Sequence, residues 1–432
     1  MPRLLLLLPA STYRAEAFLD AARSLQADVT VATERTAVLP APPSTDLLPL
    51  DFNDPAGAVR EVLDYTRRHA IDAVVGVDDR AAVLAAHLAG ALGLPHNSIA
   101  SVSAARNKYR MRELLREHGV RVPYARTFSV AENPDSLAEH VRFPCVVKPL
   151  MLSSSCGVIR ANNGPEFTVA FRRVTALLQS LGLAQRSDAG RQILVEDFVP
   201  GREVALEGLL TAGVLRVLAL FDKPDPLDGP FFEETIYVTP SRLPLAAQRE
   251  IAACAESGAH ALGLREGPIH GELRVNAEGV WVIEIAARSI GGRCSQTLRF
   301  AAGLSLEGLI LRQAFRMDLP SLERESGAAG VMMLPIPKAG VLREIRGQEA
   351  ARGVEGIEDL TITAEPGQTL VPLPEGTRYL GFLIARGATP ERVEAALREA
   401  HGRLECVIDV RAGPRAAGKK HGSSRGRRSI RF

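Results

Sequence analysis

The segment HGELRVNAEGVWVIEIAAR, residues 270–288, contains the pattern from which the fold is predicted. Apolar residues dominate both sides of Asn276 to Gly279, which predicts two antiparallel strands joined by a tight turn. Glu272 and Glu284 then face each other across the hairpin. Two carboxylates at that distance repel unless a cation lies between them, and hard oxygen ligands suit Mg²⁺. The hairpin indicates a magnesium site, and a solvent-facing acidic pair is the alternative when it is considered alone.

Upstream residues add the groups that a nucleotide triphosphate needs. Lys108 precedes a predicted strand, Cys145 to Lys148, that itself ends in a lysine. The loop SSSCGV, residues 153–158, follows. Its small residues let the main chain approach a phosphate closely, so that N–H groups can bind the oxygens. Taken alone, this loop is more often a simple turn, but together with two lysines it predicts a phosphate-binding flap.

The segment VEDFVPGRE, residues 195–203, is suited to the rest of a nucleotide. A strand that stops at Pro200-Gly201 presents free backbone groups to the edge of an adenine. The carboxylate of Glu203 can accept hydrogen bonds from both hydroxyls of a ribose. A strand that ends in a turn with exposed acids is the alternative. By contrast, the Pro-, Asp- and Gly-rich stretch from Lys223 to Pro230 predicts a surface loop.

The order of these elements resembles the ATP-grasp superfamily over roughly residues 1–320. The resemblance implies a two-lobed fold of the α/β and α+β class, with ATP and Mg²⁺, or Mn²⁺ as a substitute, as cofactors. For ATP it implies the residues Lys108, Lys148, Ser154, Ser155, Gly157, Glu196, Phe198, Val199 and Glu203. Glu272 and Glu284 would bind the metal, and Arg288 with Lys148 would be catalytic. One position departs from the family, which most often has Asn where this chain has Ala286. Either water replaces the missing oxygen ligand, or a second Mg²⁺ binds more weakly.

Residues 331–410 are similar to the small C-terminal domain of L-amino acid ligases of the bacilysin-synthetase type. The similarity lies in a strand near residues 340–345, the Pro366-Gly367 loop and the strand YLGFLIA at 379–385. It implies an ATP-dependent carboxylate–amine ligase that forms an amide or dipeptide bond through an acyl phosphate. The substrates would be amino acids or related acids and amines. Candidate substrate residues are Glu234, Arg288, Gly291, Gly292 and Arg293, followed by Ser295.

We therefore expect five parts. Residues 1–100 alternate strands with helices and predict a parallel α/β unit. They are followed by a small ATP-grasp lobe with the flap (101–190), a large lobe with the metal site (191–326), the L-amino-acid-ligase-like domain (327–410) and a basic tail (411–432). A single helix is expected from about Ala104 to His118. Asp79 ends a strand in the first part, where it caps the next helix or contacts substrate.

Composition excludes several classes of protein. The 432 residues are 46% hydrophobic and 24% charged, which excludes global disorder and a membrane-spanning bundle. Pro9 ends the apolar run from Leu4 to Leu8, so this run predicts a buried strand and no membrane segment. Five cysteines without CxxC spacing argue against a disulfide framework and a zinc knuckle, and favour the cytoplasm.

Three other functions are alternatives to the ligase. A biotin-dependent or purine-pathway carboxylase belongs to the same superfamily, and this chain has no biotinyl-type Met-Lys-Met. A catalytically impaired ATP-binding protein would be consistent with Ala286. The tail holds eight of the 52 basic residues and no acid, which would suit nucleic acid, although a solvated extension without a partner is favoured. The resemblance also suits a homodimer.

Overall fold

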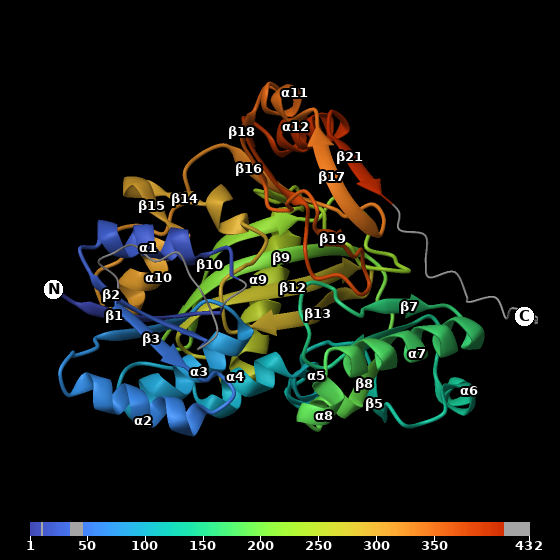
Figure 1. Ribbon diagram of the computed structural model, residues 1–432, viewed down its shortest axis with the longest axis horizontal. Coiled ribbons are helices and arrows are strands. Elements are labelled where there is room, and N and C mark those ends of the chain that lie inside the picture. The colour runs from blue at the N-terminus through green and yellow to red at the C-terminus, as the bar shows by residue number, and fades with distance from the viewer. Residues whose placement is uncertain (10–11, 35–45, 410–432) are drawn as a thin grey trace, which may run out of the picture.

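The computed structural model describes residues 1–9, 12–34 and 46–409 (Figure 1). The predictions for the basic tail lie outside the described residues. Within the described ranges, none of the helices combines the length and apolar character needed to cross a bilayer.

The N-terminal unit is a parallel sheet, as the alternation of strands and helices predicted. Its four strands run in the order β3-β2-β1-β4, with β1 at Arg3–Leu8, β2 at Asp28–Glu34, β3 at Asp46–Leu50 and β4 at Ala73–Gly76. Leu4 to Leu8 are all buried, since helices cover both faces of such a sheet. These helices are α1 (Ala15–Ser24), α2 (Pro55–Thr66) and α3 (Asp79–Ala91). Strand β3 was not predicted.

Two short helices lead into the next part of the chain, where one was predicted. Helix α4 (Ile99–Arg106) ends before Asn107, and α5 (Lys108–Glu117) begins after it. The Asn107 side chain accepts hydrogen bonds from the N–H groups of Tyr109 and Arg110, each at 3.1 Å, and so caps α5. The prediction of one helix from Ala104 to His118 is therefore wrong, because an asparagine cap interrupts the apolar periodicity. Lys108 thereby becomes the first residue of its helix.

The small lobe is an antiparallel sheet flanked by helices. Its strand order is β5-β8-β6-β7, with β5 at Ala125–Ser129, β6 at Cys145–Pro149, β7 at Ile159–Ala161 and β8 at Gln192–Asp197. Helix α7 (Gly164–Ser180) buries its apolar face against this sheet, and the short helices α6 (Pro134–Leu137) and α8 (Leu183–Arg186) flank it. The flap residues 150–158 connect β6 to β7, so they lie at one end of this sheet.

The large lobe and the C-terminal part share one eight-stranded sheet of order β13-β12-β9-β10-β11-β16-β20-β18. The first five strands are β9 (Arg202–Thr211), β10 (Val214–Asp222), β11 (Ile236–Thr239), β12 (Gly267–Asn276) and β13 (Gly279–Ala286). The other three are β16 (Ala328–Leu334), β18 (Ile357–Ile362) and β20 (Gly381–Gly387). Strand β16 pairs with β11, so the chain passes from the large lobe to the C-terminal part within one sheet (Figure 1).

Smaller elements complete the C-terminal part and the large lobe. A three-stranded sheet contains β17 (Gly340–Arg346), β19 (Thr369–Leu370) and β21 (Glu405–Asp409). Helix α11 (Gln348–Arg352) contacts β18, and α12 (Pro390–Gly402) packs against β16 and β20 of the eight-stranded sheet. The large lobe also contains helices α9 (Leu245–Ala261) and α10 (Leu306–Ala314) and the strand pair β14 (Arg299–Phe300) and β15 (Leu304–Ser305). One apolar cluster joins Leu6, Phe221 and Phe382, so three parts of the chain share a core.

Candidate functional site

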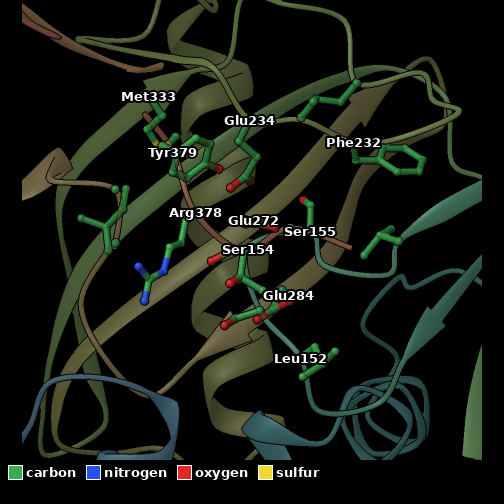
Figure 2. A pocket seen from close by; sticks show the side chains of 18 of the residues that line it. Leu152, Ser154, Ser155, Phe232, Glu234, Glu272, Glu284, Met333, Arg378 and Tyr379 are labelled. Carbon is green, nitrogen blue, oxygen red and sulfur yellow. The ribbon is translucent and has the colours of Figure 1, made fainter. Parts of the chain in front are cut away.

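A cavity of about 1000 Å³ lies where the two lobes, the N-terminal unit and the C-terminal part meet (Figure 2). Most of the predicted site residues line it, namely Lys108, Lys148, Ser154, Ser155, Glu196, Phe198, Val199, Glu203, Glu234, Glu272, Glu284, Arg288, Gly291 and Gly292. Gly157, Arg293 and Ser295 are not in the lining. Residues that are far apart in the sequence are therefore brought to one space.

The acidic hairpin forms as its sequence predicts. Strands β12 and β13 pair antiparallel, and Glu272 lies directly opposite Glu284 in the register. Each carboxylate already faces a cation, since Glu284 lies 3.0 Å from the Nζ of Lys108 and Glu272 lies 3.2 Å from the Nζ of Lys223. Figure 2 shows Glu272 and Glu284 beside Ser154 of the flap. The hairpin thus brings two carboxylates to the flap, and carboxylate oxygens are the ligands that Mg²⁺ prefers.

Lys223 is buried at the centre of a second acidic group, so its assignment to a surface loop was wrong. Its Nζ lies 2.7 Å from Glu203 and 2.6 Å from Glu234, besides the contact with Glu272. Oxygens of these three carboxylates lie within 4.8 Å of one another. The loop composition begins at Pro224, whereas Lys223 follows the last residue of buried β10. Its position at the end of an apolar strand is the signal that could have identified it.

This crowding shifts the protonation of the acidic group. Burial would lower the pKa of Lys223, but Glu203, Glu234 and Glu272 hold it well above its ordinary value. Burial raises the pKa of Glu234 to about 8, which Lys223 only partly offsets. The pKa of Glu272 lies well below its ordinary value, since Lys223 and His270 outweigh the effect of burial. Glu272 is thus ionised at neutral pH, as a metal ligand must be.

Glu196 belongs to a buried group of three charges. Its carboxylate forms ion pairs with Lys148 and, at 3.0 Å, with Arg112 of helix α5. Burial would raise the pKa of Glu196, but these two cations hold it below its ordinary value. Burial lowers the pKa of Lys148 despite its partner. Arg112 was missed by the sequence analysis, although it follows Lys108 by one helical turn and would have been expected on the same face.

The predicted nucleotide edge is partly occupied by the protein's own contacts. The Phe198 N–H donates to the Pro144 carbonyl at 3.0 Å, and the Val199 carbonyl accepts from Arg274 at 2.7 Å. Two of the backbone groups predicted to be free are therefore paired. Arg274 also lies 2.8 Å from Glu203, so the carboxylate predicted to bind ribose has Arg274 on one oxygen and Lys223 on the other.

The flap presents a curved main chain towards the cavity. Ser154 and Ser155 have φ angles of 56° and 53°, and Gly157 has 72°. The Gly157 N–H donates to the Pro374 carbonyl of the C-terminal part at 2.7 Å, which removes it from the donors that could bind phosphate. In the described part of the chain, the N–H groups of Ser154 and Ser155 have no such partner, so they remain as the candidate phosphate donors.

Arg288 pairs with a residue of the N-terminal unit. Its Nε lies 3.2 Å from the Oδ1 of Asp79, and this carboxylate raises the pKa of Arg288 against the effect of burial. The cap of helix α3 is Asp78, which accepts from the Ala81 N–H at 2.8 Å. The prediction that Asp79 caps this helix is therefore wrong by one residue. Asp79 is instead a lining residue that holds Arg288.

The glycine pair and the following arginine have different surroundings. The Gly292 N–H donates to the Tyr13 hydroxyl at 2.6 Å, and a Cβ at Gly292 would lie 2.5 Å from the sulfur of Met333. Arg293 lies away from the cavity lining, 3.7 Å from Asp359 and with its guanidinium over the Phe382 ring. The prediction that Arg293 is a substrate residue has no support from this placement.

Comparison with known proteins agrees with the fold. Family models match an ATP-grasp N-terminal domain at residues 19–96, an ATP-grasp domain at 141–297 and the L-amino acid ligase C-terminal domain 2 at 332–409. The alanine--anticapsin ligase of Bacillus subtilis strain 168 is 25% identical over 276 residues, which cover 60% of this chain and 58% of that protein. The chain thus spans less than two thirds of the length of this curated relative.

Two solved structures extend the comparison to almost the whole chain. The crystal structure of an L-amino acid ligase from Bacillus licheniformis superposes with a TM-score of 0.83 and 26% identity, covering 95% of this chain and 99% of that one. N5-carboxyaminoimidazole ribonucleotide synthetase from Thermotoga maritima shares the fold, with a TM-score of 0.67 and 18% identity over 95% of this chain and all of that one. The predicted fold and family are confirmed. The chain belongs to the ATP-grasp superfamily and carries, at residues 332–409, an L-amino acid ligase C-terminal domain.

Proposed function

We propose that this protein is an ATP-dependent carboxylate–amine ligase that forms an amide or dipeptide bond and releases ADP and phosphate. The observation that carries the proposal is the meeting of two lysines, a small-residue flap, two facing glutamates and a buried arginine in one cavity. The amino-acid-ligase names of the similar proteins support amino acids as the substrate class.

The lining fits ATP and Mg²⁺. Lys108 and Lys148 line the same cavity as Ser154 and Ser155, and the Nζ of Lys108 donates to the Leu152 carbonyl just before the flap at 2.9 Å. Glu272 and Glu284 would hold the ion, which supplies positive charge between the carboxylates and the nucleotide oxygens when bound. Ala286, two residues after Glu284, is buried and offers no oxygen from its side chain.

The reaction needs alignment and charge stabilisation more than covalent chemistry by the protein. An oxygen of the substrate carboxylate attacks the γ-phosphorus, and the bond to the bridging oxygen of ADP breaks. The nitrogen of a neutral amine then attacks the acyl carbon, the carbon–oxygen bond to phosphate breaks, and the nitrogen loses a proton. Arg288 lies where it would stabilise the negative charge of the acyl phosphate and of the tetrahedral species.

Water must be kept from the acyl phosphate, because hydrolysis would release phosphate without forming an amide. The flap and the C-terminal segment touch over the cavity through the hydrogen bond between Gly157 and Pro374. We infer that this contact closes the site during the reaction.

The experiment compares Glu284→Gln with Glu278→Gln. Both changes remove a carboxylate from the same hairpin, but Glu278 lies in the exposed turn outside the cavity lining. The purified protein is incubated with ATP, Mg²⁺ and pools of amino acids, and ADP and condensed products are measured by mass spectrometry. We expect Glu284→Gln to abolish turnover and Glu278→Gln to retain it.

Other results would contradict the proposal in different ways. Retained activity in Glu284→Gln would show that the metal binds elsewhere. ADP release that depends on bicarbonate and needs no amine would indicate a carboxylase. Tight ATP binding without ADP formation across the whole substrate pool would indicate an ATP-binding protein without turnover.

A further inference from the structure

The C-terminal wall of the cavity contains a guanidinium without a partner. Arg378 lies in the segment 371–380, which connects β19 to β20, and it is exposed to the cavity that it lines. Within residues 1–9, 12–34 and 46–409, no hydrogen bond or ion pair to its side chain is found. Figure 2 shows Arg378 next to Tyr379, on the same side of the cavity as Met333.

The other described cations of the lining are already engaged. Ion pairs with carboxylates are formed by Lys108, Lys148, Arg274 and Arg288. Arg14 donates to the carbonyls of Val77 and Ser289, and His270 lies 3.6 Å from Glu272. Arg378 therefore differs from each of them, because its side chain has no hydrogen-bond or ion-pair partner among the described residues. An unpaired guanidinium facing a cavity is suited to a ligand carboxylate, which it can bind through two parallel hydrogen bonds.

The main chain that carries Arg378 is held in place on both sides. The Gly376 N–H donates to the Pro372 carbonyl at 2.9 Å, and the Leu380 N–H donates to Leu334 of β16 at 2.9 Å. Glu375, the nearest acid in this segment, is bound by Arg173 of helix α7, with one contact of 2.9 Å. The acid closest in sequence is thus occupied, and Arg378 projects from a fixed position.

The surroundings of Arg378 match one end of an amino acid. Aromatic and apolar side chains also line the cavity here, namely Tyr13, Met333, Tyr379 and Phe382. The ring centroids of Tyr13 and Tyr379 lie 5.4 Å and 6.2 Å from that of Phe382. The phosphate-binding groups, by contrast, come from helix α5, strand β6 and the flap, which belong to the first 160 residues. In a ligation the acyl donor loses its carboxylate to phosphorylation, whereas the amine donor keeps its own. The carboxylate that remains free throughout the reaction therefore needs a separate cation.

We propose that Arg378 binds the carboxylate that an amine-donating amino acid keeps throughout the reaction. This inference rests on the proposed ligase function and goes beyond it, because it assigns a residue of the C-terminal domain that selects the amine donor. The guanidinium discriminates against simple amines, since they would leave it unpaired.

The test compares an amino acid with its carboxamide as the amine donor. The carboxamide keeps the reacting nitrogen and loses the charge that Arg378 would bind. For the wild type we expect kcat/KM to be about 10- to 100-fold higher with the free acid than with the carboxamide. Arg378→Gln should remove most of this preference by raising KM for the free acid, and Arg378→Lys should retain part of it. Arg352→Gln, in exposed α11 of the same domain and outside the lining, should behave as the wild type does.

Binding of a non-hydrolysable ATP analogue and the melting temperature are measured for each variant, so that misfolding is recognised. An unchanged preference in a folded Arg378→Gln variant would overturn the inference and leave the ligase function intact. A rise in KM for the acyl donor in Arg378→Gln would also overturn the inference. The order of residues in the product shows which substrate is the acyl donor. A wild type that forms no ADP with any acid and amine would instead refute the ligase function, and the inference with it.

Discussion

Buried charged side chains in this protein are stabilised by oppositely charged partners from distant segments of the chain. Glu196 of β8 is only 4% exposed and depends on Lys148 of β6 and Arg112 of α5. Such a group is sensitive to the loss of one member, because the remaining charge stays buried without full compensation. The loss of one member of this group should therefore lower the free energy of unfolding.

Replacing Arg112 with Met should lower the free energy of unfolding by about 3 kcal/mol or more, because Glu196 loses one of its two cations in a buried setting. Arg110→Met is the matched control, since Arg110 lies on the exposed face of the same helix and contacts only Glu113 in the described chain. It should change stability by about 0.5 kcal/mol or less. Urea unfolding followed by circular dichroism measures both values. Equal losses in the two variants would contradict this account.

Glu234 should make stability fall as pH rises. Its pKa is raised by burial from an ordinary value of 4.5 to about 8 in the folded chain. Between these two values the folded state holds a proton that the unfolded state has released, so the free energy of unfolding decreases with pH. We expect the melting temperature of the wild type to fall more steeply between pH 5 and 8 than that of Glu234→Gln, which has no such proton. Glu278→Gln should follow the wild type, and parallel curves for all three proteins would refute the assignment.

At the level of elements, the flap and the segment 371–380 fasten the small lobe to the C-terminal domain. Arg173 of α7 binds Glu375, and the guanidinium of Arg173 also lies over the Phe231 ring. The neighbouring Arg172 pairs with Asp135 at 2.7 Å, within the small lobe. Arg173 therefore connects the small lobe to the C-terminal domain, whereas Arg172 makes its contact within the small lobe.

Arg173→Gln should loosen the closed arrangement, so that water reaches the acyl phosphate and ADP is formed without an amide. The ratio of ADP to condensed product is the measurement, and it should rise above the wild-type ratio. Arg172→Gln should leave the ratio unchanged, because its partner Asp135 lies outside the contact between domains. An equal rise in both variants would show that the ratio reflects a general effect on α7.

The hairpin of β12 and β13 could be predicted because its information is local, with an alternating pattern and a turn of defined length. Lys148, near the end of β6, could be predicted for the same reason, because it follows a local apolar run. Lys223 and Arg112 have local signals, at the end of an apolar strand and one helical turn after Lys108. Their carboxylate partners could not be predicted, because these come from segments that meet only in the folded chain. Arg293 was predicted from its position after Gly291-Gly292, but its φ of 55° and its contact with Asp359 direct it elsewhere. Arg378 has no local motif and is brought to the cavity by the pairing of β16 with β20.

On the scale of the whole molecule, the eight-stranded sheet makes the large lobe and the C-terminal domain one cooperative unit. Strand β16 pairs with β11 on one side and with β20 on the other. The cluster that joins Leu6, Phe221 and Phe382 extends this continuity to the N-terminal unit. Removing the C-terminal strands would expose a sheet edge and a large apolar surface.

Deleting residues 328–409 should therefore destabilise the rest of the chain, including the nucleotide side. We expect the shortened protein to melt at a lower temperature than the full chain, or to aggregate, as measured by circular dichroism and light scattering. The full chain should show a single calorimetric transition for these parts. A shortened protein with the melting temperature of the full chain would contradict the shared core.

The pairing of β11 with β16 also limits how this scaffold can be re-engineered. The residues proposed to bind the nucleotide all precede residue 328, whereas Arg378, Tyr379 and Phe382 of the cavity lining follow it. A chimaera that carries the C-terminal domain of another protein could select another amine donor while it keeps the proposed ligase reaction. Such a graft must preserve the register of β11 and β16, in which Ile236 lies opposite Met332 and Thr239 opposite Ala329. A slip of one residue would move the side chains of β16 to the opposite face of the sheet.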